Sequence, residues 1–324
     1  MGKLVLIDGH SILNRAFYGV PELTNSEGLH TNAVYGFLNI MFKILEEEKP
    51  DHLAVAFDLK EPTFRHKMYA DYKGTRKPMP EELREQVPLM KEVLAAMGVP
   101  ILTMAGYEAD DILGTIAKRC QAEGEEVSVV SGDRDLLQLS DTHIKIRIPK
   151  TSRGTTEIHD YYPEDVKREY QVTPTEFVDV KALMGDTSDN IPGVPSIGEK
   201  TATNLIVAYG SIENAYAHLD EVKPPRAKKA LEEHYDLAVM SKELAEICIT
   251  CPIPFEYEEA KIENLYTPEA YQYMKRLEFK SILARFDVQD MGGNSVEEHF
   301  WSVEDLSGAE QIFEKAKTAE QVGC

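Results

Sequence analysis

The first half of the chain alternates short apolar runs with longer amphipathic stretches. Apolar runs rich in branched residues predict β-strands at residues 3–8, 52–58, 99–104 and 126–133. Helical spacing of apolar positions predicts helices at residues 31–48, 80–97 and 109–123. Two further runs, 143–148 and 155–160, predict a hairpin. This alternation is typical of an α/β fold with a mostly parallel central sheet and helices on both faces.

From Tyr162 onward the pattern is almost entirely helical. The expected helices lie at residues 163–170, 173–185, 199–210 and 211–219, in a longer run from 225 to 247, and at 268–286. Residues 291–295, MGGNS, predict a flexible linker. We therefore expect an α/β core at residues 1–160, a helical subdomain at 161–288, and an acidic linker with a truncated following segment at 289–324.

The amino-acid composition indicates a water-soluble protein and little more. Hydrophobic residues make up 43% of the chain and charged residues 28%. No apolar run approaches ~20 residues, and the first residues lack a signal-peptide pattern, so we expect a cytoplasmic protein without a membrane segment. Cys248 and Cys251 have CxxC spacing but no second pair, which favours ordinary reduced thiols over zinc.

The net charge of −21 argues at first against nucleic acid, but the charges are unevenly distributed. Residues 60–80 carry six Lys or Arg and two acids. This segment has no evident buried face, so it is interpreted either as a solvated surface helix or as a mobile element that becomes ordered around a ligand. Lys73 and Arg76 would then stabilise charge on a phosphodiester, and Tyr72 or Phe64 would stack on an unpaired base.

Acidic residues follow several of the predicted strands. Asp8, Asp58 and Asp133 end their strands, and the carboxyl ends of parallel strands meet at one edge of a sheet. The GYEADDILG segment (106–114) opens a helix at the same edge, and a GDRD turn lies nearby. The further acids of these two segments are Glu108, Asp110, Asp111 and Asp135.

Helix capping alone explains an isolated Asp at a helix start. So many carboxylates at one edge indicate instead that cations compensate them. Every candidate ligand is a hard oxygen, which favours Mg²⁺ or Mn²⁺ over zinc or copper.

A second acidic pair, Asp186 and Asp189, lies in a loop rich in turn residues. The following segment places two glycines before a lysine and a helix, which is typical of a helix-hairpin-helix element at about residues 188–208. Backbone N–H groups at such a helix start bind phosphates without reading sequence. A plain turn between helices is the alternative. The candidate DNA-binding residues here are Gly193, Ile197, Gly198, Lys200 and Thr201.

Six motifs in order resemble the N-terminal 5′-nuclease domain of bacterial DNA polymerases I, a domain of the flap endonuclease family. They are LVLIDGHSILNRAFY, AVAFD, FRHKMYADYKGTRKPMP, GYEADDILGTIA, VVSGDRDLLQL and LMGDTSDNIPGVPSIGEKTA. The resemblance covers roughly residues 1–288, and the residues after about 296 resemble the start of the polymerase's next domain. It implies that the chain is a fragment, or a stand-alone relative with a remnant extension.

The resemblance implies a two-metal nuclease with a PIN-like fold. Asp8, Asp58, Glu108 and Asp110 would hold the first metal, with Asp111 adjacent, and Asp133, Asp135, Asp186 and Asp189 would surround the second. Lys73 and Arg76 would lie in a helical arch at about residues 60–95 that passes the 5′ single strand. The helix-hairpin-helix would hold duplex DNA and a potassium ion.

The implied substrates are 5′ flaps, nicks and RNA–DNA primer junctions in replication and repair, with products carrying a 5′-phosphate and a 3′-hydroxyl. A PIN-like ribonuclease shares the acidic strand-end site, but the helix-hairpin-helix and the second acidic pair count against it. A receiver-type phosphoryl switch would need fewer acids and a lysine at a later strand end. A non-catalytic, structure-specific DNA-binding module is the remaining alternative.

Overall fold

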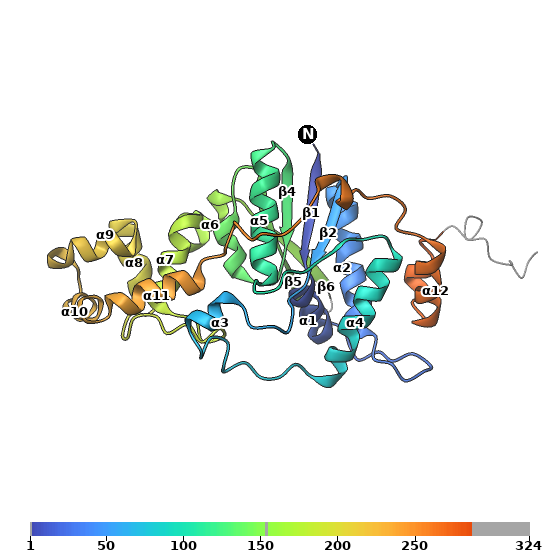
Figure 1. The fold of residues 1–324 in the computed structure, drawn as a ribbon, viewed down its shortest axis with the longest axis horizontal. Helices are drawn as coiled ribbons and strands as arrows, with labels where there is room; N and C mark the ends of the chain where they lie inside the picture. The colour runs from blue at the N-terminus through green and yellow to red at the C-terminus, as the bar shows by residue number, and fades with distance from the viewer. Residues whose placement is uncertain (1, 153–154, 287–324) are drawn as a thin grey trace, which may run out of the picture.

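The computed structural model describes residues 2–152 and 155–286 and arranges six strands in one mixed sheet (Figure 1). The strands are β1 Lys3–Asp8, β2 His52–Ala56, β3 Ile101–Leu102, β4 Glu126–Val130, β5 Ile144–Ser152 and β6 Thr155–Tyr161. Their order across the sheet is β3-β2-β1-β4-β5-β6, and only β6 runs antiparallel to its neighbour. The predicted mostly parallel α/β fold and the terminal hairpin are confirmed.

The carboxyl ends of the central strands lie level with one another. Asp8 pairs with Ala56 across β1 and β2, and Ile7 pairs with Val130 across β1 and β4. The chain moves outward from β1 first through β2 and β3 and later through β4 and β5, so the strand order reverses beside β1. Ligands of open α/β sheets bind at such a reversal, outside the carboxyl ends of the strands.

Helices cover both faces of the sheet (Figure 1). Five helices of this part of the chain are α1 Gly9–Gly19, α2 Asn32–Glu48, α3 Phe64–Met68, α4 Glu81–Ala96 and α5 Ala109–Ala122. Alternate residues of β1 enter different cores: Val5 and Ile7 pack with α1, α2 and α4, whereas Leu4 and Leu6 pack with α5. The two faces of one strand therefore join two apolar layers.

The helical part continues the core that α5 shares with the sheet, since residues of α7, α8 and α11 belong to the same buried cluster. Its elements are α6 Pro163–Tyr170, α7 Pro174–Met184, α8 Glu199–Tyr209, α9 Ile212–Ala217, α10 Pro225–Glu233 and α11 Tyr235–Ala245. Three short 3₁₀ segments lie at Arg134–Leu139 (η1), Leu219–Glu221 (η2) and Tyr257–Ala260 (η3). The chain then returns to the opposite face of the sheet through α12 Pro268–Arg276 and α13 Lys280–Leu283.

Three helix predictions were wrong in detail. The helix α1 was not predicted, although Ile12, Leu13 and Ala16 have helical spacing and Asp8 caps it by accepting the N–H of Ser11. The run from 225 to 247 is two helices, which separate at His234. The stretch 268–286 also divides, because Glu278 adopts a left-handed backbone with φ of 60°.

In the two ranges that the structure describes, no helix is long and apolar enough to cross a membrane. Cys120, Cys248 and Cys251 are free thiols there, as expected for reduced cysteines. The predicted linker at 291–295 and the acidic segment 289–324 lie outside the described residues.

Two glycines of the predicted helix-hairpin-helix differ in how much room they leave for a side chain, and this difference can be tested by measuring the stability of variants. Gly193 has φ of 63°, and a Cβ there would lie 2.4 Å from the nitrogen of Gly185. We expect Gly193→Ala to lower the free energy of unfolding by about 2–4 kcal/mol through left-handed strain and overpacking. Gly198 caps α8 and has open space where a Cβ would lie, so Gly198→Ser should stay within about 0.5 kcal/mol of wild type. Urea unfolding measures both, and equal stability of the two variants would contradict this difference in constraint.

Candidate active site

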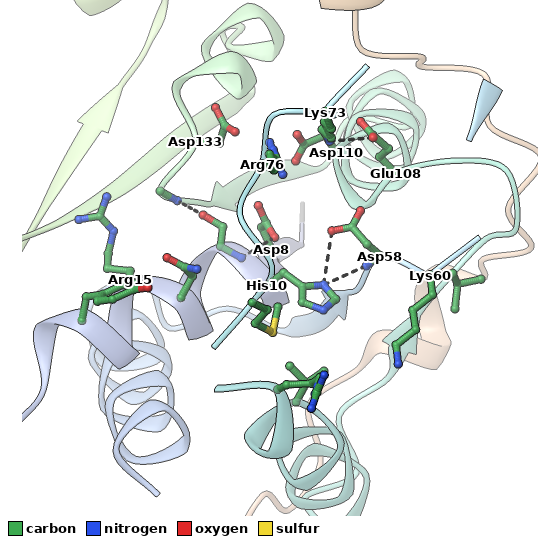
Figure 2. A pocket seen from close by; sticks show the side chains of 18 of the residues that line it. Asp8, His10, Arg15, Asp58, Lys60, Lys73, Arg76, Glu108, Asp110 and Asp133 are labelled. Carbon is green, nitrogen blue, oxygen red and sulfur yellow. Dashed lines mark hydrogen bonds and ion pairs between the residues drawn. The ribbon is translucent and has the colours of Figure 1, made fainter. Parts of the chain in front are cut away.

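A pocket of about 1080 Å³ lies at the carboxyl edge of the sheet, beside the strand-order reversal (Figure 2). Six of the predicted acids line it: Asp8, Asp58, Glu108, Asp110, Asp133 and Asp189. They come from the ends of β1, β2 and β4, the start of α5, and the loop after α7. The expectation that distant acids meet at one sheet edge is confirmed for these six.

Asp8 and Asp58 are fixed by neighbouring donors. Asp8 is 5% exposed and accepts hydrogen bonds from the N–H of Ser11 at 3.1 Å and from the hydroxyl of Ser131 at 2.8 Å. Asp58 accepts the N–H of Ala109 at 2.8 Å, and its Oδ2 lies 3.4 Å from Nδ1 of His10 (Figure 2). Each carboxylate is therefore oriented toward the pocket before any ligand binds.

The crowding changes the protonation of these acids. Burial, followed by the charge of Asp58, raises the pKa of Asp8 to about 6. Burial and the charges of Asp8 and Asp133 raise the pKa of Asp110 well above its usual range. Burial acts in the same direction on Asp58, but hydrogen bonds from His10 and Ala109 outweigh it and lower the pKa of Asp58. The pocket therefore holds more negative charge than its own donors compensate.

Lys73 and Arg76, two cations of the basic segment that line the pocket, form ion pairs with its acids. The ammonium of Lys73 lies 2.7 Å from Oε1 of Glu108 and 3.9 Å from Oδ2 of Asp189. Arg76 forms an ion pair with Asp189. Burial would lower the pKa of Lys73, but Glu108 and Asp189 outweigh it and raise that pKa, so the ammonium stays charged.

Tyr72 does not present its ring to solvent in this conformation. Its side chain is 3% exposed, and its hydroxyl donates to Glu108 at 3.1 Å and to Asp189 at 3.2 Å. The interpretation of residues 60–80 as lacking a buried face is wrong, because Tyr72 and Arg65 are both buried. This face combines polar contacts with apolar neighbours from α7, α11 and the loop after α7, and it has no local apolar periodicity, which explains why the hydrophobic pattern did not reveal it.

The main chain around Lys73 is tied to the loop that carries Asp186 and Asp189. The N–H of Lys73 donates to the carbonyl of Asp189 at 2.8 Å, and the side chain of Asn190 donates to the carbonyl of Asp71 at 2.7 Å. Lys73 and Asn190 both adopt left-handed φ values of 56°. Strained backbone of this kind is common at functional sites.

Asp111 lies outside the pocket and is fully buried against Arg65. Both of its oxygens accept from the Arg65 guanidinium at 2.8 Å, and it also accepts the N–H groups of Glu108 and Cys248. Arg65 in turn donates to the carbonyls of Leu244 and Glu246. Asp111 is therefore a helix-capping and ion-pairing residue in this structure, next to Glu108, and its place beside a metal stays a prediction.

Asp135 and Asp186 also lie outside the pocket lining, and one lysine joins them. The ammonium of Lys181, from α7, forms an ion pair with an oxygen of each carboxylate. The second oxygen of Asp186 accepts the N–H and the hydroxyl of Ser188, both at 2.7 Å. Sequence reasoning missed Lys181 as well as Arg65. Arg65 lies 46 residues from Asp111, and Lys181, although only five residues from Asp186, lies 46 from Asp135.

The residues of the predicted helix-hairpin-helix surround the start of α8. Gly193 and Ile197 are buried, Gly198 and Lys200 are exposed, and Thr201 is half-buried in the first turn. Gly198 is the N-cap of α8, and no side chain caps that helix. Its first N–H groups are therefore not covered by a cap, as a phosphate-binding helix start requires.

The pocket acids suit a divalent ion in chemistry, since they are hard oxygens, and burial together with mutual repulsion raises the pKa values of Asp8 and Asp110. Their present arrangement is not a closed cage: in residues 2–152 and 155–286, no three Asp, Glu, His or Cys side chains are placed to hold one ion together. Lys73 and Arg76 instead engage the oxygens of Glu108 and Asp189.

The sheet with its acidic edge and the attached helices define an α/β fold of the nuclease type, and family models agree. Residues 3–171 match the 5′-3′ exonuclease N-terminal resolvase-like domain, and residues 172–267 match the 5′-3′ exonuclease C-terminal SAM fold. The chain belongs to the 5′-3′ exonuclease family.

Curated relatives are longer than this chain. DNA polymerase I of Bacillus caldotenax is 47% identical over 285 residues, which is 88% of this chain and 32% of that protein. DNA polymerase I of Bacillus subtilis is 44% identical over 306 residues, covering 94% of this chain and 34% of that protein. The chain thus spans about a third of the length of these relatives.

Solved structures share the fold. The T5 D15 protein, co-crystallised with metal ions, superposes with a TM-score of 0.64 at 22% identity, over 87% of this chain and 98% of that one. The catalytic core of Rad2 in complex with a DNA substrate gives a TM-score of 0.55 at 12% identity, over 87% and 91%. At these identities the likeness establishes the architecture alone.

Asp111 offers a test that separates an ion pair from a metal ligand. Because Asp111→Asn removes the bidentate charged partner of the buried Arg65 and leaves it only Glu108, at 3.3 Å, the free energy of unfolding should fall by about 3–5 kcal/mol in metal-free urea titrations. The exposed acid variant Glu232→Gln should unfold like wild type. A fully stable Asp111→Asn protein that loses only metal binding would contradict the ion-pair role.

The raised pKa values predict how stability without metal depends on pH. A carboxylate whose folded pKa exceeds its unfolded value binds more protons in the folded state, so its stabilisation is lost as pH rises through the folded pKa. The pKa of Asp8 is raised to about 6 and that of Asp135 to about 7, so thermal stability in EDTA should fall between pH 5 and 7, by at most about 1.4 kcal/mol per pH unit for each group while the pH is below its folded pKa. Asp58 and Asp186, with lowered pKa values, remain ionised throughout that window.

Two controls test whether the pocket acids cause this pH dependence of stability: the variant Asp8→Asn, and wild type with added Mg²⁺. Asp8→Asn should reduce the slope of stability against pH, because one titrating group is gone. Saturating Mg²⁺ should flatten the wild-type curve, because a cation stabilises the ionised acids. Stability that rises from pH 5 to 7 in EDTA would show that the pocket acids are not destabilised by their charge.

Proposed function

We propose that the chain is a structure-specific 5′ nuclease that hydrolyses phosphodiesters of DNA and of RNA primers at 5′ flaps and nicks, in DNA replication and repair. The observation that carries this proposal is the gathering of six carboxylates in one pocket with Lys73 and Arg76 at its edge. Membership of the 5′-3′ exonuclease family and the fold shared with the T5 D15 protein support it.

The chain's own residues would position the phosphodiester. Lys73 and Arg76 are the cations nearest the acids, and a phosphate that enters the pocket offers them an alternative anionic partner. Their charges would then neutralise the phosphate as negative charge develops on it. Tyr72, buried beneath them, would keep Glu108 and Asp189 in place through its hydroxyl.

The proposed cofactors are two divalent ions, Mg²⁺ or Mn²⁺. When bound, they supply a water of lowered pKa and positive charge on the reacting phosphate. The six pocket acids would hold them, with Asp8, Asp58, Glu108 and Asp110 forming the first set. Asp135 and Asp186 already share the ammonium of Lys181, so they would join the second set, with Asp133 and Asp189, only if Lys181 released them.

The start of α8 would hold the duplex beside the cleavage site. Gly198 leaves open space next to the helix N-terminus, and Lys200 is exposed one residue into its first turn. Phosphates bind at such positions through backbone N–H groups and a flexible cation. A potassium ion at this hairpin is part of the proposal.

The relatives also support a proposal about the cellular setting. We propose a cytoplasmic, nucleoid-associated protein that acts on RNA–DNA primer junctions, with a polymerase covalently joined in the natural protein. Support comes from the DNA polymerase I relatives, of which the chain covers about a third. The acidic segment 289–324 would then connect the nuclease to the next domain.

Asp110→Ala tests the proposed reaction. With a 5′-flap duplex in Mg²⁺ or Mn²⁺, the variant should cut at least about 100-fold more slowly than wild type, because it removes a central pocket acid. Its affinity for the flap in Ca²⁺ should change by less than about threefold. Gel assays of cleavage and fluorescence anisotropy of binding measure the two effects, with Glu232→Gln as the matched control.

Three results would contradict the proposal in different ways. Cleavage by Asp110→Ala at the wild-type rate would show that the pocket is not the catalytic site. Wild-type cleavage of unstructured RNA in preference to flap DNA would favour a ribonuclease. Binding of the flap without any cleavage, with or without EDTA, would indicate a DNA-binding module.

A further inference from the structure

The pocket extends beyond its carboxylates into a second region, which we call the outer lobe. Its lining comes from α1, from α4 and from the segments that follow β2 and precede α4. It combines apolar and cationic side chains, namely Arg15, Tyr18, Leu59, Lys60, Met79 and Lys91. None of these six side chains is a carboxylate, so the outer lobe differs in chemistry from the acidic end.

The apolar residues of the outer lobe are unusually exposed. Among the residues that the structure describes, nine large hydrophobic side chains are exposed, and Tyr18, Leu59 and Met79 are three of them. Tyr18 is 70% exposed, more than any of the others. Single exposed apolar residues are ordinary, whereas several that converge on one pocket mark a binding surface.

The cations of the outer lobe lack acidic partners. Across residues 2–152 and 155–286, no carboxylate lies within ion-pair distance of Arg15, Lys60 or Lys91. The Nε of Arg15 is buried without a hydrogen-bond acceptor, and the ammonium of Lys91 lies 4.7 Å above the ring of Phe57. Unpaired cations beside exposed apolar groups suit a ligand that is both anionic and flat.

We propose that the outer lobe binds an unpaired nucleotide next to the phosphodiester that is cut, with the ring of Tyr18 stacked on its base. This inference rests on the proposed function. Phe17 contacts the ring of Tyr18 edge to face, with centroids 5.1 Å apart, so one aromatic residue steadies the ring while most of its surface stays open. The cations of the lobe then face the phosphate of the same nucleotide.

In this structure Tyr18, and not Tyr72, has an aromatic ring that is free to stack on a base. Tyr72 is 3% exposed and has its hydroxyl engaged by two carboxylates, so its ring has no open face in this structure. Tyr18 lies on α1, the one helix of the sheet layers that the hydrophobic pattern did not predict. Every base has a flat π-face, so a tyrosine here binds without selecting sequence.

The experiment measures flap binding by wild type, Tyr18→Ala and Tyr18→Phe in Ca²⁺, with fluorescence anisotropy. Tyr18→Ala should bind a 5′-flap duplex about 5- to 100-fold more weakly, the range of one base–aromatic stack. Tyr18→Phe keeps the ring and should bind within about twofold of wild type. Tyr162, 36% exposed and away from this pocket, provides the control variant Tyr162→Ala, which should also bind like wild type.

Flaps that lack a single base identify the nucleotide that Tyr18 contacts. The same measurements use flaps in which each of the first unpaired nucleotides in turn carries an abasic sugar. At the nucleotide that Tyr18 contacts, wild type should bind the abasic flap as weakly as Tyr18→Ala does, and the two proteins should become equal. At the other positions the difference between them should persist.

Two outcomes would overturn the inference. Tyr18→Ala could bind every flap like wild type, or its defect could persist unchanged at every abasic position, which would mean that no base is stacked. Cleavage by wild type in Mg²⁺ is measured in parallel. If wild type cuts flaps while either outcome holds, only the stacking assignment is overturned; if wild type cuts no flap, the proposed function is overturned as well.

Discussion

The negative charge of the carboxylates crowded at the sheet edge must be compensated, and the other features of this structure depend on this constraint. The parallel sheet brings acids to one edge, and each one needs either a nearby cation or a raised pKa. Arg65 compensates Asp111, and Lys181 compensates Asp186. Lys181 also pairs with Asp135, but burial and the charge of Asp133 outweigh it and raise the pKa of Asp135 to about 7. Asp8 and Asp110 have no such partner, and their pKa values are raised. The unpaired acids are therefore concentrated where the pocket opens.

The same ion pairs join segments that are far apart in the sequence. Arg65 connects α3 with the start of α5 and the end of α11, because its guanidinium reaches Asp111 and the carbonyls of Leu244 and Glu246. Lys181 connects α7 with η1 through Asp135. Buried pairs of this kind contribute little net stability, but removing one partner is costly, so they fix relative position more than they add stability. The helical part is thereby held in register with the sheet edge.

Sequence reasoning recovers the sheet and its acidic edge, because both follow from short-range patterns. An apolar run that ends in Asp predicts a strand end, and parallel strands bring such ends together. Which of the nine acids line the pocket and which are held in ion pairs outside it is long-range information: Arg65 is 46 residues from Asp111, and Lys181 is 46 from Asp135. Tyr72 illustrates the same point, since the residues that bury it, among them Val178 and Leu244, and the acids that accept from its hydroxyl all lie far from it along the chain. The missed helix α1 is different, because its apolar spacing is present in the sequence.

An acidic chain that handles nucleic acid must concentrate its few cations where the phosphates lie. The net charge of −21 repels a polyanion at long range, and salt screens this repulsion beyond about 10 Å. Close to the pocket the balance differs, because Arg15, Lys60 and Lys91 have no acidic partners among the described residues. Lys73 and Arg76 are already paired with Glu108 and Asp189, so a phosphate can recruit them only by exchanging partners. Such an exchange would separate Lys73 from Glu108 and Arg76 from Asp189. In the proposed nuclease, binding of the substrate and the demand for a divalent ion would therefore be linked through Lys73 and Arg76.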